Sequence, residues 1–457
     1  MFRRILVANR GEVAARVLRT CRRLGIHTVA VAADVDRDLS YLRLADEVAP
    51  IGDRRAYLDA PLLVEVAEAH RCSALHPGWG FLSENPTFAG LCEAARVSFV
   101  GPSSASMRLM ADKAQARRTM ASLGLPPIPG CDEGIPDAAT AQLMAEQVGY
   151  PVLLKAISGG GGRGMRRVHR PQDLASTFAE ASAEAQAAFN DGRLYMERLI
   201  EGGRHIELQV LSDGRRAVIL GERECSVQRR HQKLIEESPS PVLDSQTRAE
   251  VFQRAAAAVQ ALGYRGAGTI EMLRDRQGAL WFMEMNTRLQ VEHTVTELVR
   301  GLDLVEWQLR IAANQELPAD FGQAPPQGHA IECRINAERV SQDFRPVPGP
   351  LTRLVLPEGE GIRVDTHLAQ GDRVSPHYDS MIAKVITSGP DRPAALERMR
   401  QALDQLQVEG VPTTVALHKA VLAHPRFCSG DYDTAFLEEA MARGEIVLTE
   451  DGTGEEA

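Results

Sequence analysis

Long apolar runs and closely spaced cysteines are both missing from this chain of 457 residues. The longest apolar stretches, such as ILVA and AVILG, are long enough only for a strand, so we expect no membrane span. The N-terminus, MFRRILVANRG, leads directly into a strand pattern, and we expect no cleavable secretory leader. The seven cysteines form no CxxC pair, which indicates that most are buried thiols in a reducing cytoplasm.

Lysine is also scarce, because almost all of the 52 basic residues are arginines. The five lysines are Lys113, Lys155, Lys233, Lys384 and Lys419. A lysine retained where arginine predominates can mark a position that needs a compact ammonium rather than a planar guanidinium. Three of them, Lys113, Lys155 and Lys233, lie in motif-like surroundings. The net charge of −9 argues against a general nucleic-acid-binding protein.

Strand and helix patterns alternate at the start of the chain. Residues 4–8 are typical of a strand, residues 13–24 of an amphipathic helix, and residues 27–33 of a second strand. A strand–helix–strand unit of this length predicts a parallel sheet. The turn before the helix lacks GxGxxG, which argues against dinucleotide binding. The chain is too long for one core, so we expect two or three domains.

The segment 281–297, WFMEMNTRLQVEHTVTE, begins with an alternation that predicts a strand. In that strand Phe282, Glu284 and Asn286 would share one face, and bulky apolar side chains would occupy the other. If the extended conformation continues, the Glu284 face also carries three further polar side chains, namely Arg288, Gln290 and Glu292. A solvated edge strand is the alternative, but the apolar face indicates that the segment is anchored in a core.

A second strand just upstream, GTIEML, carries Glu271, and the intervening RDRQG suits a hairpin turn. Such a hairpin would place Glu271 close to Glu284 on the neighbouring strand. Two carboxylates that close repel each other unless a cation lies between them. The sequence therefore predicts a divalent-metal site with anion-binding groups beside it.

A glycine-rich loop follows a strand that ends in Lys155, in the sequence YPVLLKAISGGGGRGMRRV. Consecutive glycines expose backbone N–H groups, which suits phosphate binding, and Lys155 adds a point charge. The loop is not of the Walker type, because GK[ST] is missing. We expect a mobile flap that closes over a nucleotide. Further polar and basic side chains favour anion binding over a solvated basic loop, and they include Gln228, His231 and Lys233.

Eight motifs along the chain resemble those of a known family. They are NRGEVAARV, HPGWGFLSEN, KAISGGGGRGMR, CSVQRRHQK, GAGTIEM, MEMNTRLQVEH, ECRINAE and YDSMIAK. Together they resemble the biotin carboxylase component of biotin-dependent carboxylases, which are ATP-grasp enzymes. The resemblance extends from about residue 2 to about residue 440.

This resemblance implies a multidomain fold that combines α/β and α+β classes. An N-terminal parallel α/β domain would be followed by an ATP-grasp domain with a mobile lid and by a C-terminal mixed α+β domain. The implied ranges are 1–110, 111–325 with the lid at about 131–200, and 326–445. We expect the acidic tail at 446–457 to be disordered. The resemblance also implies a homodimer.

Roles for particular residues follow from the same resemblance. ATP phosphates would be bound by Lys113 and Lys155 and covered by lid glycines that include Gly161 and Gly162. Other nucleotide contacts would come from Glu197, Arg198, Leu199 and Ile200 beside the adenine, and from His205, Gln228 and His231. Two Mg²⁺ or Mn²⁺ ions would be held by the oxygen ligands that such ions prefer, from Glu271, Glu284 and Asn286.

The remaining implied roles concern bicarbonate and biotin. Bicarbonate would be bound by Lys233, Arg288, Gln290 and the backbone of Val291. Glu292 would be the general base that deprotonates bicarbonate, and Arg334 would stabilise the ureido oxygen of biotin as an enolate. Bicarbonate would attack the γ-phosphate of ATP to give carboxyphosphate and ADP. Carboxyphosphate would then release CO₂, which biotin captures, while the closed lid excludes water.

Two parts of a complete biotin-dependent carboxylase are missing from this sequence. It contains no Met-Lys-Met biotinylation site, so biotin would arrive on a biotin carboxyl carrier protein, and no carboxyltransferase region follows. We expect a cytoplasmic subunit of an acyl-CoA carboxylase that serves acetyl-CoA and fatty acid synthesis. Pyruvate or propionyl-CoA as acceptor, another ATP-grasp carboxylate–amine ligase, and an inactive assembly subunit remain alternatives. Three positions depart from the usual family pattern, namely Trp79, Arg198 and Thr294.

Overall fold

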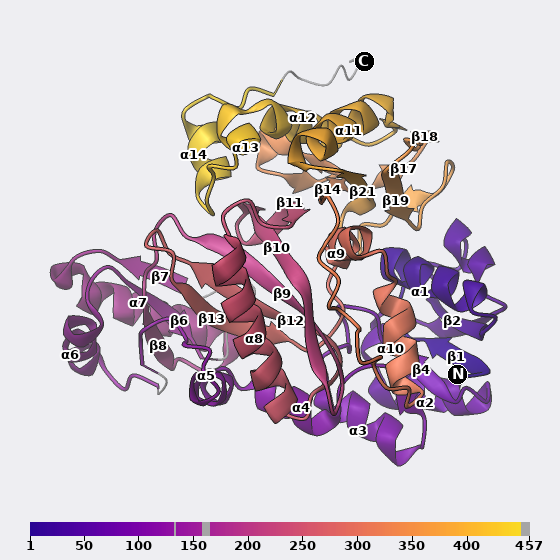
Figure 1. The fold of residues 1–457 in the computed structure, drawn as a ribbon, viewed down its shortest axis with the longest axis horizontal. Helices are drawn as coiled ribbons and strands as arrows, with labels where there is room; N and C mark the ends of the chain where they lie inside the picture. Colours follow the sequence, from indigo (N-terminus) through magenta and orange to yellow (C-terminus); the bar gives the residue numbers. More distant parts are fainter. Residues whose placement is uncertain (132–133, 158–164, 449–457) are drawn as a thin grey trace.

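The computed structural model describes residues 1–131, 134–157 and 165–448. The glycines Gly161 and Gly162 of the predicted loop and residues 449–457 of the acidic tail therefore lie outside the described residues. Figure 1 shows three lobes around a central sheet. The start of the chain forms one lobe, the segment with α6 (Ala138–Val148) and α7 (Leu174–Phe189) forms a second, and the C-terminal helices form a third.

The N-terminal lobe is built on a five-stranded parallel sheet with the order β3-β2-β1-β4-β5. Arg4 of β1 pairs with His27 of β2 in parallel register, which confirms the predicted strand–helix–strand unit. The strands are β1 (Arg4–Val7), β2 (His27–Ala33), β3 (Glu47–Gly52), β4 (Ala74–His76) and β5 (Ser98–Phe99). The helices of this lobe are α1 (Gly11–Arg23), α2 (Ala60–Ala69) and α3 (Pro86–Ala94).

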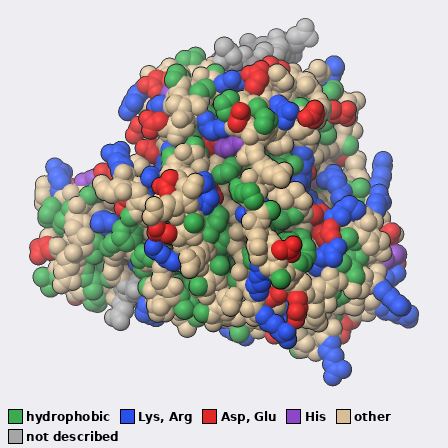
Figure 2. Space-filling view, viewed as in Figure 1, with side chains coloured by type: hydrophobic (Ala, Val, Ile, Leu, Met, Phe, Trp, Pro, Cys, Tyr) green, Lys and Arg blue, Asp and Glu red, His purple; other side chains and the backbone are tan. Residues whose placement is uncertain are grey.

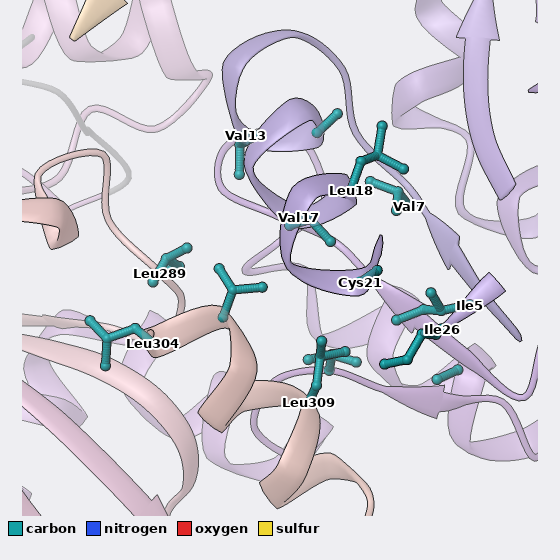
Figure 3. Close-up of a cluster of buried hydrophobic side chains, with 14 of the residues drawn as sticks. Ile5, Val7, Val13, Val17, Leu18, Cys21, Ile26, Leu289, Leu304 and Leu309 are labelled. Carbon is teal, nitrogen blue, oxygen red and sulfur yellow. The ribbon is translucent and has the colours of Figure 1, made fainter. Parts of the chain in front are cut away.

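The core of this lobe continues into a helix that lies far away in sequence. Side chains of β1 and α1, such as Val7 and Val17, pack in one buried cluster with Leu304 and Leu309 of α10 (Leu304–Ala312). Figure 3 shows these side chains converging between α1 and α10. The N-terminal lobe is thus joined to the middle of the chain by apolar packing.

An eight-stranded sheet, antiparallel throughout, forms the centre of the molecule, with the order β13-β12-β9-β10-β11-β14-β21-β19. Glu236 of β11 pairs with Glu332 of β14, so the sheet continues across residue 325, where the resemblance implies a domain boundary. The strands are β9 (Arg204–Asp213), β10 (Ala217–Arg229), β11 (Gln232–Ser238), β12 (Arg265–Arg274), β13 (Leu280–Asn286), β14 (His329–Asn336), β19 (Ile362–Thr366) and β21 (Met381–Gly389).

Helices cover this sheet and connect it to the other lobes. One helix, α8, packs on the half of the sheet formed by β9, β10, β12 and β13, and α11 packs against β14 and β21. The helices of the middle and C-terminal parts are α4 (Ser104–Ala111), α5 (Lys113–Ser122), α8 (Ser245–Ala261), α9 (His293–Arg300), α11 (Arg392–Gln405), α12 (Val415–Ala423), α13 (Pro425–Ser429) and α14 (Phe436–Ala442).

The second lobe is a small three-stranded antiparallel sheet with two helices. Its strand order is β7-β6-β8, and α6 and α7 share a buried apolar cluster with it. The elements are β6 (Val152–Ala156), β7 (Met165–Val168), β8 (Leu194–Arg198), α6 (Ala138–Val148) and α7 (Leu174–Phe189). They all fall within the range that the resemblance assigns to a lid.

The distribution of surface charge, the state of the cysteines and the character of the described helices agree with the expectations from composition. Acidic and basic side chains are interspersed over the face of the molecule shown in Figure 2. None of the seven cysteines is disulfide-bonded and five are buried, which confirms the prediction that most are buried thiols. None of the described helices combines the length and the apolar character that crossing a membrane requires.

Candidate active site

A cavity of about 1140 Å³ opens where the small sheet, the central sheet and the C-terminal part meet. Its wall contains every described residue to which the resemblance gives a role. These residues are Lys113, Lys155, Glu197, Arg198, Leu199, Ile200, His205, Gln228, His231, Lys233, Glu271, Glu284, Asn286, Arg288, Gln290, Val291, Glu292 and Arg334. Residues that are as much as 221 positions apart in the sequence thus share one cavity.

The predicted acidic hairpin is present. Glu271 of β12 lies directly opposite Glu284 of β13, and Asn286 follows two residues later. The alternation predicted for β13 is wrong at one point, because a bulge inserts Met283 between two paired positions. Phe282 therefore turns into the buried core, although it was expected to share a face with Glu284, whereas Met283 lines the cavity.

The strand also stops earlier than predicted. β13 ends at Asn286, and Arg288, Gln290 and Glu292 lie on a loop before α9 rather than on an extended strand. A carboxylate from the N-terminal lobe holds this loop, because Glu84 accepts bonds from the Thr287 N–H and the Arg288 guanidinium, both at 2.9 Å. The loop still brings its polar side chains to the cavity wall.

Opposite charges alternate at the centre of the cavity. Lys233 contacts Glu207, and its ammonium lies 2.6 Å from Glu292 and 3.4 Å from Glu271. Arg334 donates to Glu292 at 2.8 Å. Burial alone would raise the pKa of Glu292, but Lys233 and Arg334 hold it well below its ordinary value. Glu292 is therefore ionised and bound by two cations.

The two hairpin carboxylates differ in their surroundings. Glu271 accepts bonds from Asn286 at 2.7 Å and Gln290 at 2.8 Å, and the His205 ring lies 3.1 Å away. Burial opposes ionisation of Glu271, yet Lys233 and His205 lower its pKa. The pKa of Glu284 is raised by burial and by the negative charge of Glu271.

This arrangement fits a divalent cation. A cation beside Glu271 and Glu284 would remove their repulsion, and the two carboxylates and the Asn286 amide oxygen are the hard ligands that Mg²⁺ and Mn²⁺ prefer. Another close group of potential ligands contains His205, Glu207 and Glu271. In that group Glu207 already pairs with both Lys233 and Arg223, so the hairpin is the better site.

The nucleotide side of the cavity is formed by the small sheet. Glu197 of β8 pairs with both Lys155 of β6 and Arg117 of α5. The Arg198 guanidinium lies 5.3 Å from the centre of the Trp281 ring, so the arginine at this position stacks on the central sheet. A basic wall around a buried carboxylate suits a polyanion such as a triphosphate.

Polar residues of the central sheet complete this side. His205 is bonded to the Gln228 amide at 2.7 Å, and His231 lies in the turn between β10 and β11. Lys113 is the first residue of α5 and follows Asp112, whose side chain caps that helix. His205, Gln228, His231 and Lys113 all line the same cavity.

Several residues of the site were not found by sequence reasoning as site residues. Arg223 is fully buried and donates to Gln209, Glu207 and Gln290, which fixes the Gln290 amide. Lys384 donates to the Val291 carbonyl at 2.7 Å. The available signals for Lys384 were the scarcity of lysine and the motif YDSMIAK, which ends at this residue. Nothing in the local sequence distinguishes Arg223 from its many neighbouring arginines.

The buried carboxyl group of Glu332 should make the stability of the fold depend on pH. Burial raises its pKa to about 8 despite the nearby Lys384, from an ordinary value of 4.5. The folded protein therefore keeps a proton that the unfolded chain releases, so this stabilisation is complete below pH 4.5 and is lost as the pH rises through about 8. We expect Glu332→Gln to raise the melting temperature by a few degrees at pH 9 and much less at pH 5.

Thermal melts across that pH range check this prediction. Glu250→Gln is the matched control, because Glu250 is exposed on α8 and pairs with two residues of the same helix, Arg254 and Gln246. A shift for Glu332→Gln that does not change with pH would show that Glu332 is ionised in the folded protein throughout.

The two sheets that enclose the cavity, and the acidic hairpin at the edge of the central sheet, are those of an ATP-grasp enzyme. The family model described as carbamoyl-phosphate synthase L chain, ATP binding domain, matches residues 112–320. The biotin carboxylase N-terminal and C-terminal domain models match residues 1–107 and 332–439. The chain therefore belongs to the biotin carboxylase family of ATP-grasp ligases.

Similar curated proteins agree with this family. The chain is 47% identical over 443 residues to a biotin carboxylase of Nostoc, covering 96% of this chain and 99% of that protein. It is 47% identical over 446 residues to a Pseudomonas aeruginosa biotin carboxylase, with 96% and 99% coverage. A chloroplastic biotin carboxylase of Arabidopsis thaliana is 44% identical, with 98% and 85% coverage.

Solved structures have the same fold. The biotin carboxylase domain dimer of Hydrogenobacter thermophilus 2-oxoglutarate carboxylase, in complex with MgADP, ADP and bicarbonate, has a TM-score of 0.94 at 42% identity. The matched region covers 98% of this chain and 100% of the 2-oxoglutarate carboxylase chain. A Campylobacter jejuni biotin carboxylase complex with a β,γ-ATP ligand has a TM-score of 0.92 at 43% identity, with 96% and 99% coverage.

Proposed function

We propose that this chain uses ATP and bicarbonate to carboxylate biotin that is attached to a separate carrier protein. The observation that carries this proposal is the position of Glu292, a buried carboxylate bound by Lys233 and Arg334 on the wall that also holds the Glu271–Glu284 hairpin. A nucleophile activated by Glu292 would therefore lie beside the phosphates that it attacks. Holding the two reactants in this way can lower the activation free energy of the phosphoryl transfer substantially.

Binding of bicarbonate would change the charge state of Glu292. Lys233 and Arg288 line the cavity near Glu292 and form the cationic part of the anion site. A bound bicarbonate would draw Lys233 away from Glu292 and add a negative charge nearby, and both effects raise the pKa of Glu292. The carboxylate would then accept the bicarbonate proton within hydrogen-bonding distance.

The nucleotide would be held by residues on both sides of the cavity. Lys113 and Lys155 would neutralise the phosphates, the Glu197–Ile200 segment would flank the adenine, and His205, Gln228 and His231 would support it. Glu271, Glu284 and Asn286 would hold Mg²⁺ or Mn²⁺, which supplies charge neutralisation at the transferred phosphoryl group. Closing of the small sheet over the cavity would exclude water from the reactive carboxyphosphate.

The second half of the reaction requires a site for biotin. Arg334 donates to Glu236 at 2.6 Å and to Glu292 at 2.8 Å, so its guanidinium has a fixed position on the cavity wall. In that position it would stabilise the developing enolate of the biotin ureido group. CO₂ released from carboxyphosphate would be captured at the biotin nitrogen, whose proton the departing phosphate can accept.

The proposed reaction would take place between three domains. We assign residues 1–110 to an N-terminal domain, 111–325 to the ATP-grasp domain with its lid at about 131–200, and 326–445 to a C-terminal domain, supported by the separate ranges of the three family models. Because the sheet runs from β11 into β14, the second and third domains would move together rather than hinge at residue 325.

The final carboxyl acceptor would be acetyl-CoA, with a carrier protein and a carboxyltransferase as partners and a homodimer as the working form. The free-standing bacterial and chloroplast relatives support this choice. A second candidate is a subunit of a carboxylase that acts on a keto acid. It is supported by the likeness to the biotin carboxylase subunit of a pyruvate carboxylase, with a TM-score of 0.86 at 43% identity.

An ATPase assay tests the proposed function. We expect ADP release to require bicarbonate and to rise when free biotin is added, because bicarbonate is the nucleophile and biotin removes the CO₂ that is formed. ADP release that is independent of bicarbonate but requires an amine would indicate a carboxylate–amine ligase instead. Identification of the proteins that copurify with the chain would then distinguish between the acceptors.

A further inference from the structure

Lys384 is the most completely buried lysine in the described part of the chain, with 0% of its surface exposed, and the functional roles given above do not include it. Burial of an ammonium is costly unless it is paired and hydrogen-bonded. Its ammonium donates to the Val291 carbonyl at 2.7 Å and lies 3.2 Å from Glu12 and 4.0 Å from Asp365. These three contacts come from the cavity loop, α1 and β19, so Lys384 joins three separate parts of the fold.

The partners of Lys384 in the sheet explain its orientation. On β21 it pairs in register with Arg334 of β14 on one side and with Asp365 of β19 on the other. Directly opposed residues in antiparallel strands project to the same face of a sheet. Lys384 and Arg334 are therefore neighbouring cations on one face, and Asp365 compensates part of their charge.

These two cations hold two consecutive residues of the loop before α9. Arg334 binds the Glu292 carboxylate, and Lys384 binds the carbonyl of the preceding residue, Val291. On the other side of Val291, the carbonyl of Gln290 accepts a hydrogen bond from the His293 ring at 2.8 Å. The peptide groups on both sides of Val291 are thus fixed by side chains.

The direction of the Val291 N–H follows from this arrangement. In a planar trans peptide the N–H points opposite to the carbonyl of the same peptide group. The Gln290 carbonyl lies against His293, so the Val291 N–H points away from His293, and Val291 lines the cavity. Without Lys384, the next peptide could rotate and carry Val291 and Glu292 with it.

We infer that Lys384 is a positioning residue that sets the backbone of the anion-binding loop from beneath, with Glu12 as its counterion. This inference rests on the proposed function for the identity of the anion, which is bicarbonate. Lys384 does not line the cavity, so it acts through Val291 and Glu292 rather than by contact with the substrate. Lysine suits this role better than arginine, because a compact ammonium fits between a carbonyl and a carboxylate where a planar guanidinium is larger.

Steady-state kinetics with Lys384→Met test the inference. We expect the KM for bicarbonate to rise about tenfold or more, as for loss of one hydrogen bond from a charged donor. The KM for ATP should remain within about twofold, because the nucleotide residues are held by other contacts. Lys419→Met is the matched control, since the Lys419 side chain is 43% exposed and pairs with Asp404 on the surface. Equal changes in both KM values, or no change in the KM for bicarbonate, would overturn the inference.

The single variant leaves Glu12 buried without its cation and can fail to fold. The double variant Glu12→Gln/Lys384→Met removes one charge of each sign and keeps the balance. We expect the same selective rise in the KM for bicarbonate from this variant, and an unchanged KM would contradict the positioning role.

Amide hydrogen exchange gives a readout that does not depend on activity. Exchange of a peptide covering residues 287–293 should be faster in the Lys384 variants, whether single or double, and unchanged in Lys419→Met. Unchanged exchange in a folded Lys384 variant would overturn the inference even if the enzyme is active. If the unaltered chain shows no bicarbonate-dependent ADP release while the Lys384 variants show faster exchange, the proposed function fails and the positioning role stands.

Discussion

Glu292→Gln is expected to lower kcat for bicarbonate-dependent ATP cleavage by about 10²- to 10⁴-fold, the range typical for loss of a general base. The amide has nearly the same shape as the carboxylate but cannot accept the bicarbonate proton. Lys233 and Arg334 keep their other carboxylate partners, Glu207 and Glu236, so the cavity should retain its structure. ADP release is the measurement for kcat, and a nucleotide-binding titration should give a Kd for ATP close to that of the unaltered chain.

The matched control for this prediction is Glu236→Gln. Glu236 is also fully buried and also binds Arg334, but it lies on β11 and does not line the cavity. Glu236→Gln disturbs only the position of Arg334, which would act on biotin, so it should lower kcat for bicarbonate-dependent ATP cleavage much less than Glu292→Gln does. If Glu292→Gln retains most of its turnover, Glu292 binds cations but does not act as the base.

Glu284→Gln is expected to separate metal binding from stability. The pKa of Glu284 is raised by burial and by the charge of Glu271, so in the absence of metal its ionised form is unfavourable. Removing that charge should leave the melting temperature of metal-free protein equal or higher. The same change removes a metal ligand, so we expect activity to fall by about 10²-fold and the required Mg²⁺ concentration to rise.

Glu271→Gln gives the contrasting result at the facing position. Glu271 is bound by Lys233, His205, Asn286 and Gln290, so its loss breaks a buried network and should destabilise the fold by about 3 kcal/mol. Activity should fall in both variants, whereas the melting temperature without metal should fall only in Glu271→Gln. A loss of stability in Glu284→Gln equal to that in Glu271→Gln would contradict the metal site between the two carboxylates.

Local patterns in the sequence were sufficient to predict the parallel N-terminal sheet and the acidic hairpin. The period of two, the turn sequence RDRQG and the isolated carboxylates are all properties of neighbouring residues, and they are enough to predict that Glu271 lies near Glu284. The bulge at Met283 could not be predicted in this way. The bulge lets Phe282 pack in the buried core, which a strict alternation along β13 would not allow. Packing against distant residues therefore determines where the bulge occurs.

Contacts between distant parts of the chain set the rest of the site. Glu84 holds Arg288 across 204 residues, and Lys384 holds Val291 across 93 residues. No local pattern reports on such pairs, because the partners meet only when the lobes pack together. The resemblance to a known family supplied the roles of the cavity residues, whereas the structure supplies the side chains that hold those residues in position.

Isotope transfer from bicarbonate to phosphate tests the central claim most directly. If bicarbonate attacks the γ-phosphate, one of its oxygen atoms remains on phosphorus when carboxyphosphate releases CO₂. With bicarbonate labelled by ¹⁸O, phosphorus NMR of the released phosphate should therefore show one labelled oxygen per phosphate in a bicarbonate-dependent turnover. Phosphate without label would show that water is the nucleophile and would contradict the alignment of bicarbonate with ATP in this cavity.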